Sequence, residues 1–225
     1  MQDLCKLLIK KGELKEDIFA ATTQTMQYFK DAASEFELYY KKNLASEHEK
    51  IEVIYQNKNQ YEFQLRFAGD VLVFMMHTDI FEFSRNHEVM RTKYINDDIN
   101  RSYCGMIQVF NFLSDSFKYN RINDIGYMIG RILINKDQHY YVEGKRELAQ
   151  VLNNFSMNKL TPESVREILH SAIKYTINFD LLLPNYDTFK EVTVHDIMQM
   201  EDSIYTLTTA KRLGFKFEPD TNNKK

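Results

Sequence analysis

The 225-residue sequence contains no tryptophan, only seven glycines, three prolines and two cysteines. Two cysteines, Cys5 and Cys104, are too few for a disulfide framework or a four-cysteine zinc site, and they favour a reducing compartment. The chain has no Gly/Ser-rich or Pro-rich linker at which two domains would separate. We therefore expect a single domain over residues 1–218, followed by a polar, frayed tail at 219–225.

Long apolar runs and an excess of positive charge are also missing. No segment approaches the roughly 20 apolar residues of a membrane-spanning helix, and the N-terminal stretch lacks the apolar core and cleavage site of a secretory signal. The 29 basic and 32 acidic residues are interspersed and give a formal net charge of −3. Because phosphate neutralisation dominates nucleic-acid binding, we expect no nucleic-acid partner. We expect a cytoplasmic protein without membrane contact, and the abundance of Asn, Ile, Lys, Phe and Tyr suggests a bacterial origin.

Apolar residues recur at helical spacing near the start of the chain. They are three, four or seven positions apart, which predicts a helix over residues 14–43. Gly12 interrupts the preceding segment, so residues 4–11 are expected to form a separate short helix. The predicted long helix measures about 45 Å, so part of its apolar stripe is a candidate contact with a partner protein or a second copy. The alternative is packing on the chain's own sheet. This 19–40 stripe consists of Phe19, Met26, Phe29, Phe36 and Tyr40.

The middle of the chain has the periodicity of β-strands. Every second residue is apolar in "YEFQLRF" at 61–67, which is typical of a strand with one exposed face. The segment "DVLVFMM" at 70–76 is apolar on both faces, as in a central strand. We expect five or six antiparallel strands within residues 50–145, including a hairpin that joins "IGYMIGRILIN" to "HYYVEGK".

Helical patterns return over residues 146–215. Thr161 and Pro162 supply the N-cap and the first position of one helix, and two more helices are expected at 146–155 and 193–215. A long N-terminal helix, an antiparallel meander and C-terminal helices packed on the sheet define an α+β fold.

The hairpin carries the candidate chemistry. Asp124 and the triplet Glu143-Gly144-Lys145 resemble the Asp…Glu-x-Lys signature of the PD-(D/E)xK nuclease superfamily. In that family two carboxylates hold a divalent metal and the lysine helps to activate the attacking water. The resemblance implies a metal-dependent nuclease or hydrolase that uses Glu143 and Lys145. Strand geometry, however, places Asp124 roughly 20 Å from the level of Glu143, so the second carboxylate would have to come from another strand.

The pairing of this hairpin raises a second possibility. A two-residue or four-residue loop within "NKDQ" would pair Gly130 with Glu143. Glycine in a strand often marks the close approach of another group, so a small-molecule pocket would lie over the glycines. The alternative is a helix of the same chain packed there, with Glu143 and Lys145 as an ion pair. The candidate ligand-binding residues on this face are His139, Tyr141, Glu143, Gly130 and Gly126.

No motif indicates a cofactor or a metal. The six histidines form no i,i+4 pair and no His-x-His motif. The sequence therefore favours a non-catalytic binding module that self-associates, for example as a homodimer, or serves a larger assembly. A metal-dependent nuclease or hydrolase and a small-molecule sensor are the alternatives.

Overall fold

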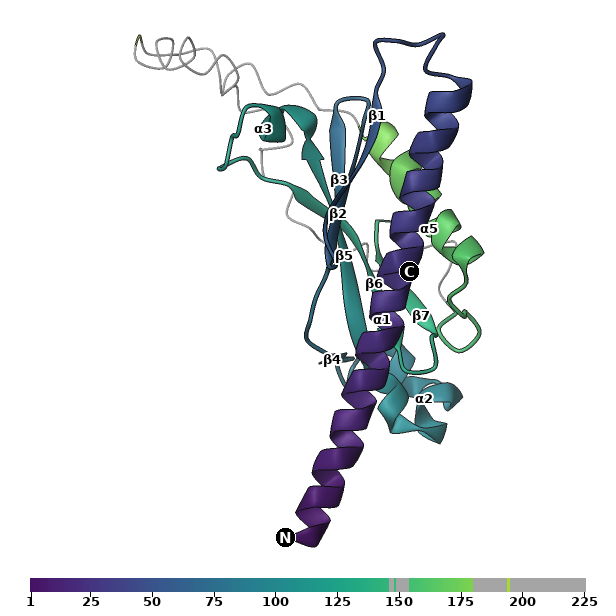
Figure 1. The fold of residues 1–225 in the computed structure, drawn as a ribbon. Helices are drawn as coiled ribbons and strands as arrows, with labels where there is room; N and C mark the ends of the chain where they lie inside the picture. The colour runs from purple at the N-terminus through teal and green to yellow at the C-terminus, as the bar shows by residue number, and fades with distance from the viewer. Residues whose placement is uncertain (146–147, 149–153, 180–193, 195–225) are drawn as a thin grey trace, which may run out of the picture.

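The protein is described here by a computed structural model, which defines residues 1–145, 148, 154–179 and 194 (Figure 1). The tail at 219–225 and, apart from single positions, the helices expected at 146–155 and 193–215 lie outside the described residues. Within the described residues the chain has the expected α+β class. A long N-terminal helix and a later helix pack on an antiparallel sheet.

The first element, α1, is one continuous helix over Gln2–Asn43. The expected break at Gly12 is therefore wrong, and the helix begins twelve residues earlier than the expected residue 14. A glycine costs only about 1 kcal/mol relative to alanine in a helix, and the flanking leucines, lysines and glutamates are good helix formers. At 1.5 Å per residue the helix is roughly 60 Å long, and its first turns extend beyond the sheet (Figure 1).

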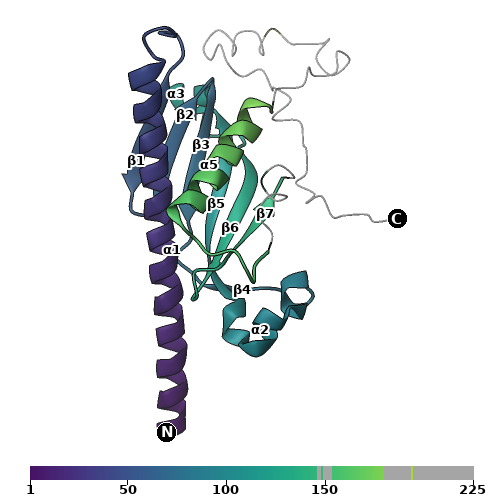
Figure 2. The ribbon, with the colours of Figure 1, turned by 90° about the vertical axis from the view of Figure 1, so that its right-hand side faces the viewer.

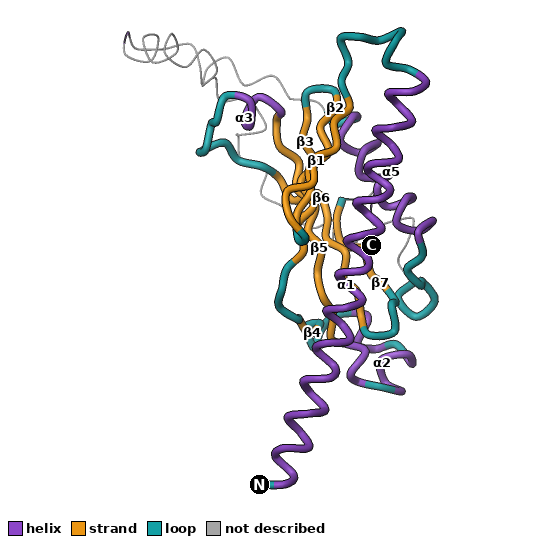
Figure 3. The backbone as a smooth tube through the Cα atoms, viewed as in Figure 1, coloured by secondary structure: helices purple, strands orange, loops and turns teal. Residues whose placement is uncertain are grey.

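The sheet has seven strands within the described residues, and every pairing is antiparallel. Six strands follow one another in chain order, which confirms the expected meander (Figure 3). A short seventh strand, β4 (Phe81–Glu82), pairs with the beginning of β5. The six strands are β1 (Val53–Asn59), β2 (Glu62–Phe67), β3 (Asp70–Met76), β5 (Tyr103–Leu113), β6 (Tyr127–Asn135) and β7 (Tyr140–Gly144).

Two helices, α1 and α5 (Pro162–Ile177), lie side by side on one face of the sheet (Figure 2). The N-terminus of α5 confirms the predicted cap. The Thr161 hydroxyl accepts a hydrogen bond from the Ser164 backbone N–H at 3.2 Å, and the Ser164 hydroxyl accepts one from the Thr161 N–H at 2.9 Å. These two bonds satisfy donors that a helix start leaves without intrahelical partners.

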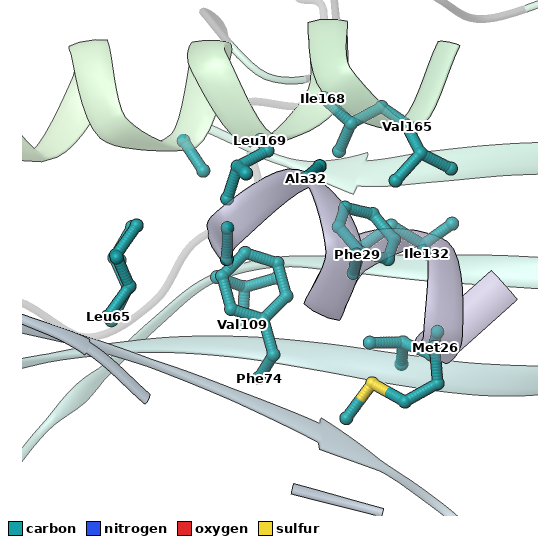
Figure 4. Packing of buried hydrophobic residues seen from close by; sticks show 14 of the residues in the cluster. Met26, Phe29, Ala32, Leu65, Phe74, Val109, Ile132, Val165, Ile168 and Leu169 are labelled. Carbon is teal, nitrogen blue, oxygen red and sulfur yellow. The ribbon is translucent and has the colours of Figure 1, made fainter. Parts of the chain in front are cut away.

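The main hydrophobic core lies between these helices and the sheet (Figure 4). Phe29 of α1 and Phe74 of β3 have ring centroids 5.2 Å apart, and Phe74 stacks on Phe63 of β2 at 4.6 Å. Met26 and Phe29 are fully buried, and the other members of the 19–40 stripe pack against the same core. The stripe therefore packs on the chain's own core, as the alternative expectation had it, and a partner contact through its half-buried members stays a prediction.

At Gly105 of β5 the sheet and α1 approach each other closely. A Cβ atom on Gly105 would lie 2.0 Å from Thr22 Oγ1 and 2.9 Å from Thr22 Cβ. Thr22 is fully buried, and its hydroxyl donates to the Ile18 carbonyl at 2.7 Å. Only a residue without a side chain fits at this crossing point.

A smaller apolar cluster lies on the other face of the sheet. Alternate residues of a strand point to opposite faces of the sheet. The strand residues that point away from the main core contact the segment between β4 and β5. That segment contains η1 (Glu88–Arg91), α2 (Lys93–Asp97) and η2 (Ile99–Ser102). A further short helix, α3 (Ser114–Lys118), follows β5. The cluster consists of Phe83, Val89, Ile95, Cys104, Met106, Leu133, Tyr141 and Phe155.

Among the residues that the structure describes, no helix has a stretch long and apolar enough to cross a bilayer.

Candidate functional site

The register of the β6–β7 hairpin differs by one residue from the expected one. Glu143 lies opposite Arg131, and Gly130 lies opposite Gly144. The expected loop of two or four residues is wrong, because the connection has three residues, Lys136 to Gln138. Gln138 adopts a left-handed conformation with φ of 61°, as three-residue hairpin loops require.

Asn135 explains why this odd-length loop forms. Its side-chain Oδ1 accepts hydrogen bonds from the backbone N–H groups of Asp137 and His139, each at 3.0 Å. The fully buried Asn135 also donates through Nδ2 to Tyr94 Oη at 3.0 Å. The side chain therefore holds the turn in one conformation and binds it to the segment between β4 and β5.

The corrected register separates the glycines from Glu143. Gly130 now lies on the core face, where a Cβ atom would be 3.2 Å from Leu148 Cδ2. At Gly126 a Cβ atom would be 2.3 Å from the Phe112 ring. Side chains of this chain therefore fill the space beside both glycines, and this geometry gives no support to a ligand pocket over them.

Glu143 is held by two basic side chains. Arg131 Nε donates to Glu143 Oε2, and His87 Nε2 lies 3.2 Å from Glu143 Oε1. The His87 side chain is 21% exposed and that of Glu143 is 25% exposed. A carboxylate whose two oxygens are already engaged by neighbouring side chains has less capacity left to bind a metal. The arrangement attaches the segment that contains η1 to the strands β6 and β7.

Tyr141 and His139 have equally defined partners. Tyr141 Oη donates to Glu88 Oε1 at 2.7 Å, and burial together with this bond raises the pKa of Tyr141. The His139 ring stacks on Tyr94 with centroids 4.8 Å apart, and its Nδ1 lies 2.9 Å from the Phe155 carbonyl oxygen. Burial raises the pKa of Tyr94 to about 12. These residues form a packed aromatic and polar cluster, which joins four chain segments.

The structure does not bring Asp124 to Glu143. Asp124 precedes the first residue of β6, accepts a hydrogen bond from Ser116 at 2.7 Å and pairs with Arg121 at 3.0 Å. Across the described part of the chain, no three His, Cys, Asp or Glu side chains gather closely enough to hold a metal ion. Asp124 and Glu143 are thus engaged in separate structural contacts.

The N-terminal end of α1 carries a feature that sequence reasoning missed. Residues 1–10 are all exposed, and the first contact with the sheet is made by Lys11, whose Nζ lies 3.2 Å from the centroid of the Tyr103 ring. Three leucines in the exposed part, Leu4, Leu7 and Leu8, are 64–73% exposed. We call these three residues the leucine patch.

The leucine patch continues the buried face of α1. Leu7 is one heptad before Leu14 and two before Ala21, and Leu4 is two heptads before Ile18; these three later residues are buried. Residues seven positions apart lie on the same side of a helix. The sequence contains a signal for this continuity, because the seven-residue spacing of apolar residues is the same before and after Gly12.

Other exposed apolar residues lie in the segment between β5 and β6. Phe117, Tyr119, Ile122 and Ile125 are 39–83% exposed. They belong to a short helix and a loop and do not continue any buried face.

No protein-family model, curated protein or solved structure matches this chain. The geometry of its own residues therefore carries the functional argument.

Proposed function

We propose that this protein is a non-catalytic interaction module and that the leucine patch is its binding element. The observation that carries the proposal is the continuity of one helical face across the edge of the sheet. From Leu14 to Ala33 the face is buried by the chain itself, and from Leu4 to Leu8 the same face is exposed.

The size of the exposed face supports a binding role. Single exposed leucines are common on protein surfaces, but here three share one face within two consecutive turns. Complete burial of a leucine side chain is worth about 1.5–3 kcal/mol. Because each of the three is about two-thirds exposed, a partner that covered them would gain roughly 3–6 kcal/mol from this chain alone.

The polar cluster around Glu143 also supports a non-catalytic role. Its carboxylate is engaged by Arg131 and His87, and Tyr141 donates to Glu88. A catalytic acid or base needs a proton-transfer route to a substrate, whereas these groups are satisfied by one another. We therefore favour interaction over the metal-dependent hydrolase.

The test is photo-crosslinking in the cells from which the gene comes. A photoreactive amino acid replaces Leu8 in the full chain, and a matched variant carries it at Glu13, which is exposed on the opposite side of α1. We expect one crosslinked product of defined mass from position 8, none from position 13, and loss of the product when Leu4 and Leu7 are changed to Ser.

The mass of the product identifies the partner as a second copy or as another protein. The absence of any crosslinked product from position 8 would refute the proposed function.

A further inference from the structure

Resting on the proposed function, we infer that the occupant of the leucine patch is the leucine patch of a second copy, with the two α1 helices antiparallel. The result is a homodimer with a two-fold axis near Lys6 and Leu7. In such an arrangement the same surface is used by both copies.

The position of the sheet decides the orientation of the pair. The leucine patch faces the side of α1 on which the sheet lies, because it shares heptad positions with Leu14 and Ile18, which the sheet covers. A second helix that ran parallel to α1 on this side would enter the space that the sheet occupies. An antiparallel helix leads away past Met1, where no other described segment lies close to the helix (Figures 1 and 2).

The edge of the sheet also sets the register. Lys11 packs on Tyr103 at the start of β5, so the partner helix has to end at about this level. Its Met1 then lies near residue 11 or 12 of the first copy, and facing residues have numbers that add up to about 12 or 13. In this register Leu4 lies opposite the partner's Leu8, and the partner's Leu4 lies opposite Leu8.

The charges of the exposed turns agree with the antiparallel register. Asp3 and Lys10 are seven residues apart and therefore lie on the same flank of the helix. In the antiparallel pair Asp3 lies at the level of the partner's Lys10, and the contact is repeated by symmetry. In a parallel pair this flank of the two copies would lie on opposite sides of the contact, so that Asp3 of one copy could not meet Lys10 of the other.

The extent of the contact predicts a reversible dimer. About three helical turns from each copy bury less than the roughly 1,600 Å² of a standard stable interface. Interfaces of this class dissociate on dilution, so the fraction of dimer should increase with protein concentration.

The native cysteines allow a direct measurement of this geometry. Cys5 is exposed and Cys104 is buried, so a spin label attaches at residue 5 of the unaltered chain. In the antiparallel pair, residue 5 faces residue 7 or 8 of the partner, and the two labels lie within about 20 Å. A second variant, Cys5→Ser with Ala20→Cys, places the label at an exposed position further along α1. In the antiparallel pair, the two copies of residue 20 are about 27 residues apart along the helix axis. At 1.5 Å per residue this distance is roughly 40 Å.

Light scattering over a range of concentrations measures the association itself. We expect a monomer–dimer equilibrium that is weakened at least tenfold by the triple change Leu4→Ser, Leu7→Ser and Leu8→Ser. The change Leu38→Ser is the matched control, because Leu38 is 60% exposed on the same helix but far from the patch. It should leave the equilibrium unchanged. Because all four side chains are exposed, the folded state should survive each change, which thermal denaturation checks.

Three results would overturn the inference: a monomer at every concentration, a dimer that the triple change does not weaken, or a short distance between labels at position 20. A monomer that still gives a crosslinked product with another protein from position 8 overturns the homodimer and leaves the proposed function intact. A monomer without any such product overturns both.

Discussion

The change Gly105→Ala tests how α1 packs on the sheet. The packing decides which part of the apolar face of α1 stays exposed to a partner. The new Cβ atom would lie 2.0 Å from Thr22 Oγ1, whereas ordinary contacts begin near 3.4 Å. Rotation of the Thr22 side chain cannot remove the clash, because its Cβ is itself at 2.9 Å and Cγ2 at 3.1 Å. Helix and strand have to move apart. Because overpacking typically costs 1–3 kcal/mol, we expect a loss of about 2–3 kcal/mol.

A double-mutant cycle with Thr22→Ala isolates this contact. Alanine at position 22 keeps the Cβ at 2.9 Å but removes the hydroxyl and methyl groups, so the remaining movement is about half an ångström. Thr22→Ala alone loses one buried hydrogen bond to Ile18 and gains helix propensity, and should cost under about 1 kcal/mol. The two changes should therefore be coupled by about 1–2 kcal/mol, with the double variant more stable than the sum predicts.

The assay is urea denaturation, with thermal denaturation as a second probe. A loss of 2–3 kcal/mol corresponds to a decrease in Tm of roughly 4–12 °C for a chain of this length. Gly12→Ala is the matched control, because nothing lies within 4 Å of its Cβ position in the same helix, and it should add about 0.5–1 kcal/mol. A Gly105→Ala variant as stable as the wild type, or additive effects in the cycle, would refute the described packing of α1 on β5.

Three further outcomes follow from individual contacts. Thr161→Ala removes the hydroxyl that caps α5 and should cost about 1 kcal/mol in urea denaturation. The hydrogen bond from Lys136 holds the pKa of Asp98 below its ordinary value of 3.8. The stability from this pair is therefore fully present above that value and is lost as the pH falls through the lower folded-state pKa. Asp98→Asn should cost about 1 kcal/mol at neutral pH, and the difference from wild type in urea titrations should shrink as the pH falls below 3.8. Glu143→Gln leaves Arg131 without its counter-charge and should cost about 1–2 kcal/mol; an unchanged urea midpoint would contradict a structural role for this pair.

Local periodicity was sufficient for the elements whose partners are sequence neighbours. The pairing of β1 with β2, of β2 with β3 and of β6 with β7 was predictable because alternation marks each strand and short turns make consecutive strands pair. The start of α5 was predictable because Thr161 and Pro162 act on backbone groups within one turn. The register of the last hairpin was not predictable, because it depends on Asn135. That side chain binds its own loop and, through Tyr94, a segment about forty residues away in sequence.

The sequence alone determined that α1 has one apolar face, since spacing along a helix sets which side chains share a side. Only the tertiary structure decided where along α1 that face stops being internal. The sheet covers it from Leu14 onward and ends at Tyr103, so the leucines at positions 4, 7 and 8 remain exposed. The same distinction applies to Glu143. Its strand was evident from the pattern, but its neighbours Arg131 and His87 come from the fold, because the pairing of strands and the packing of distant segments decide which charges meet.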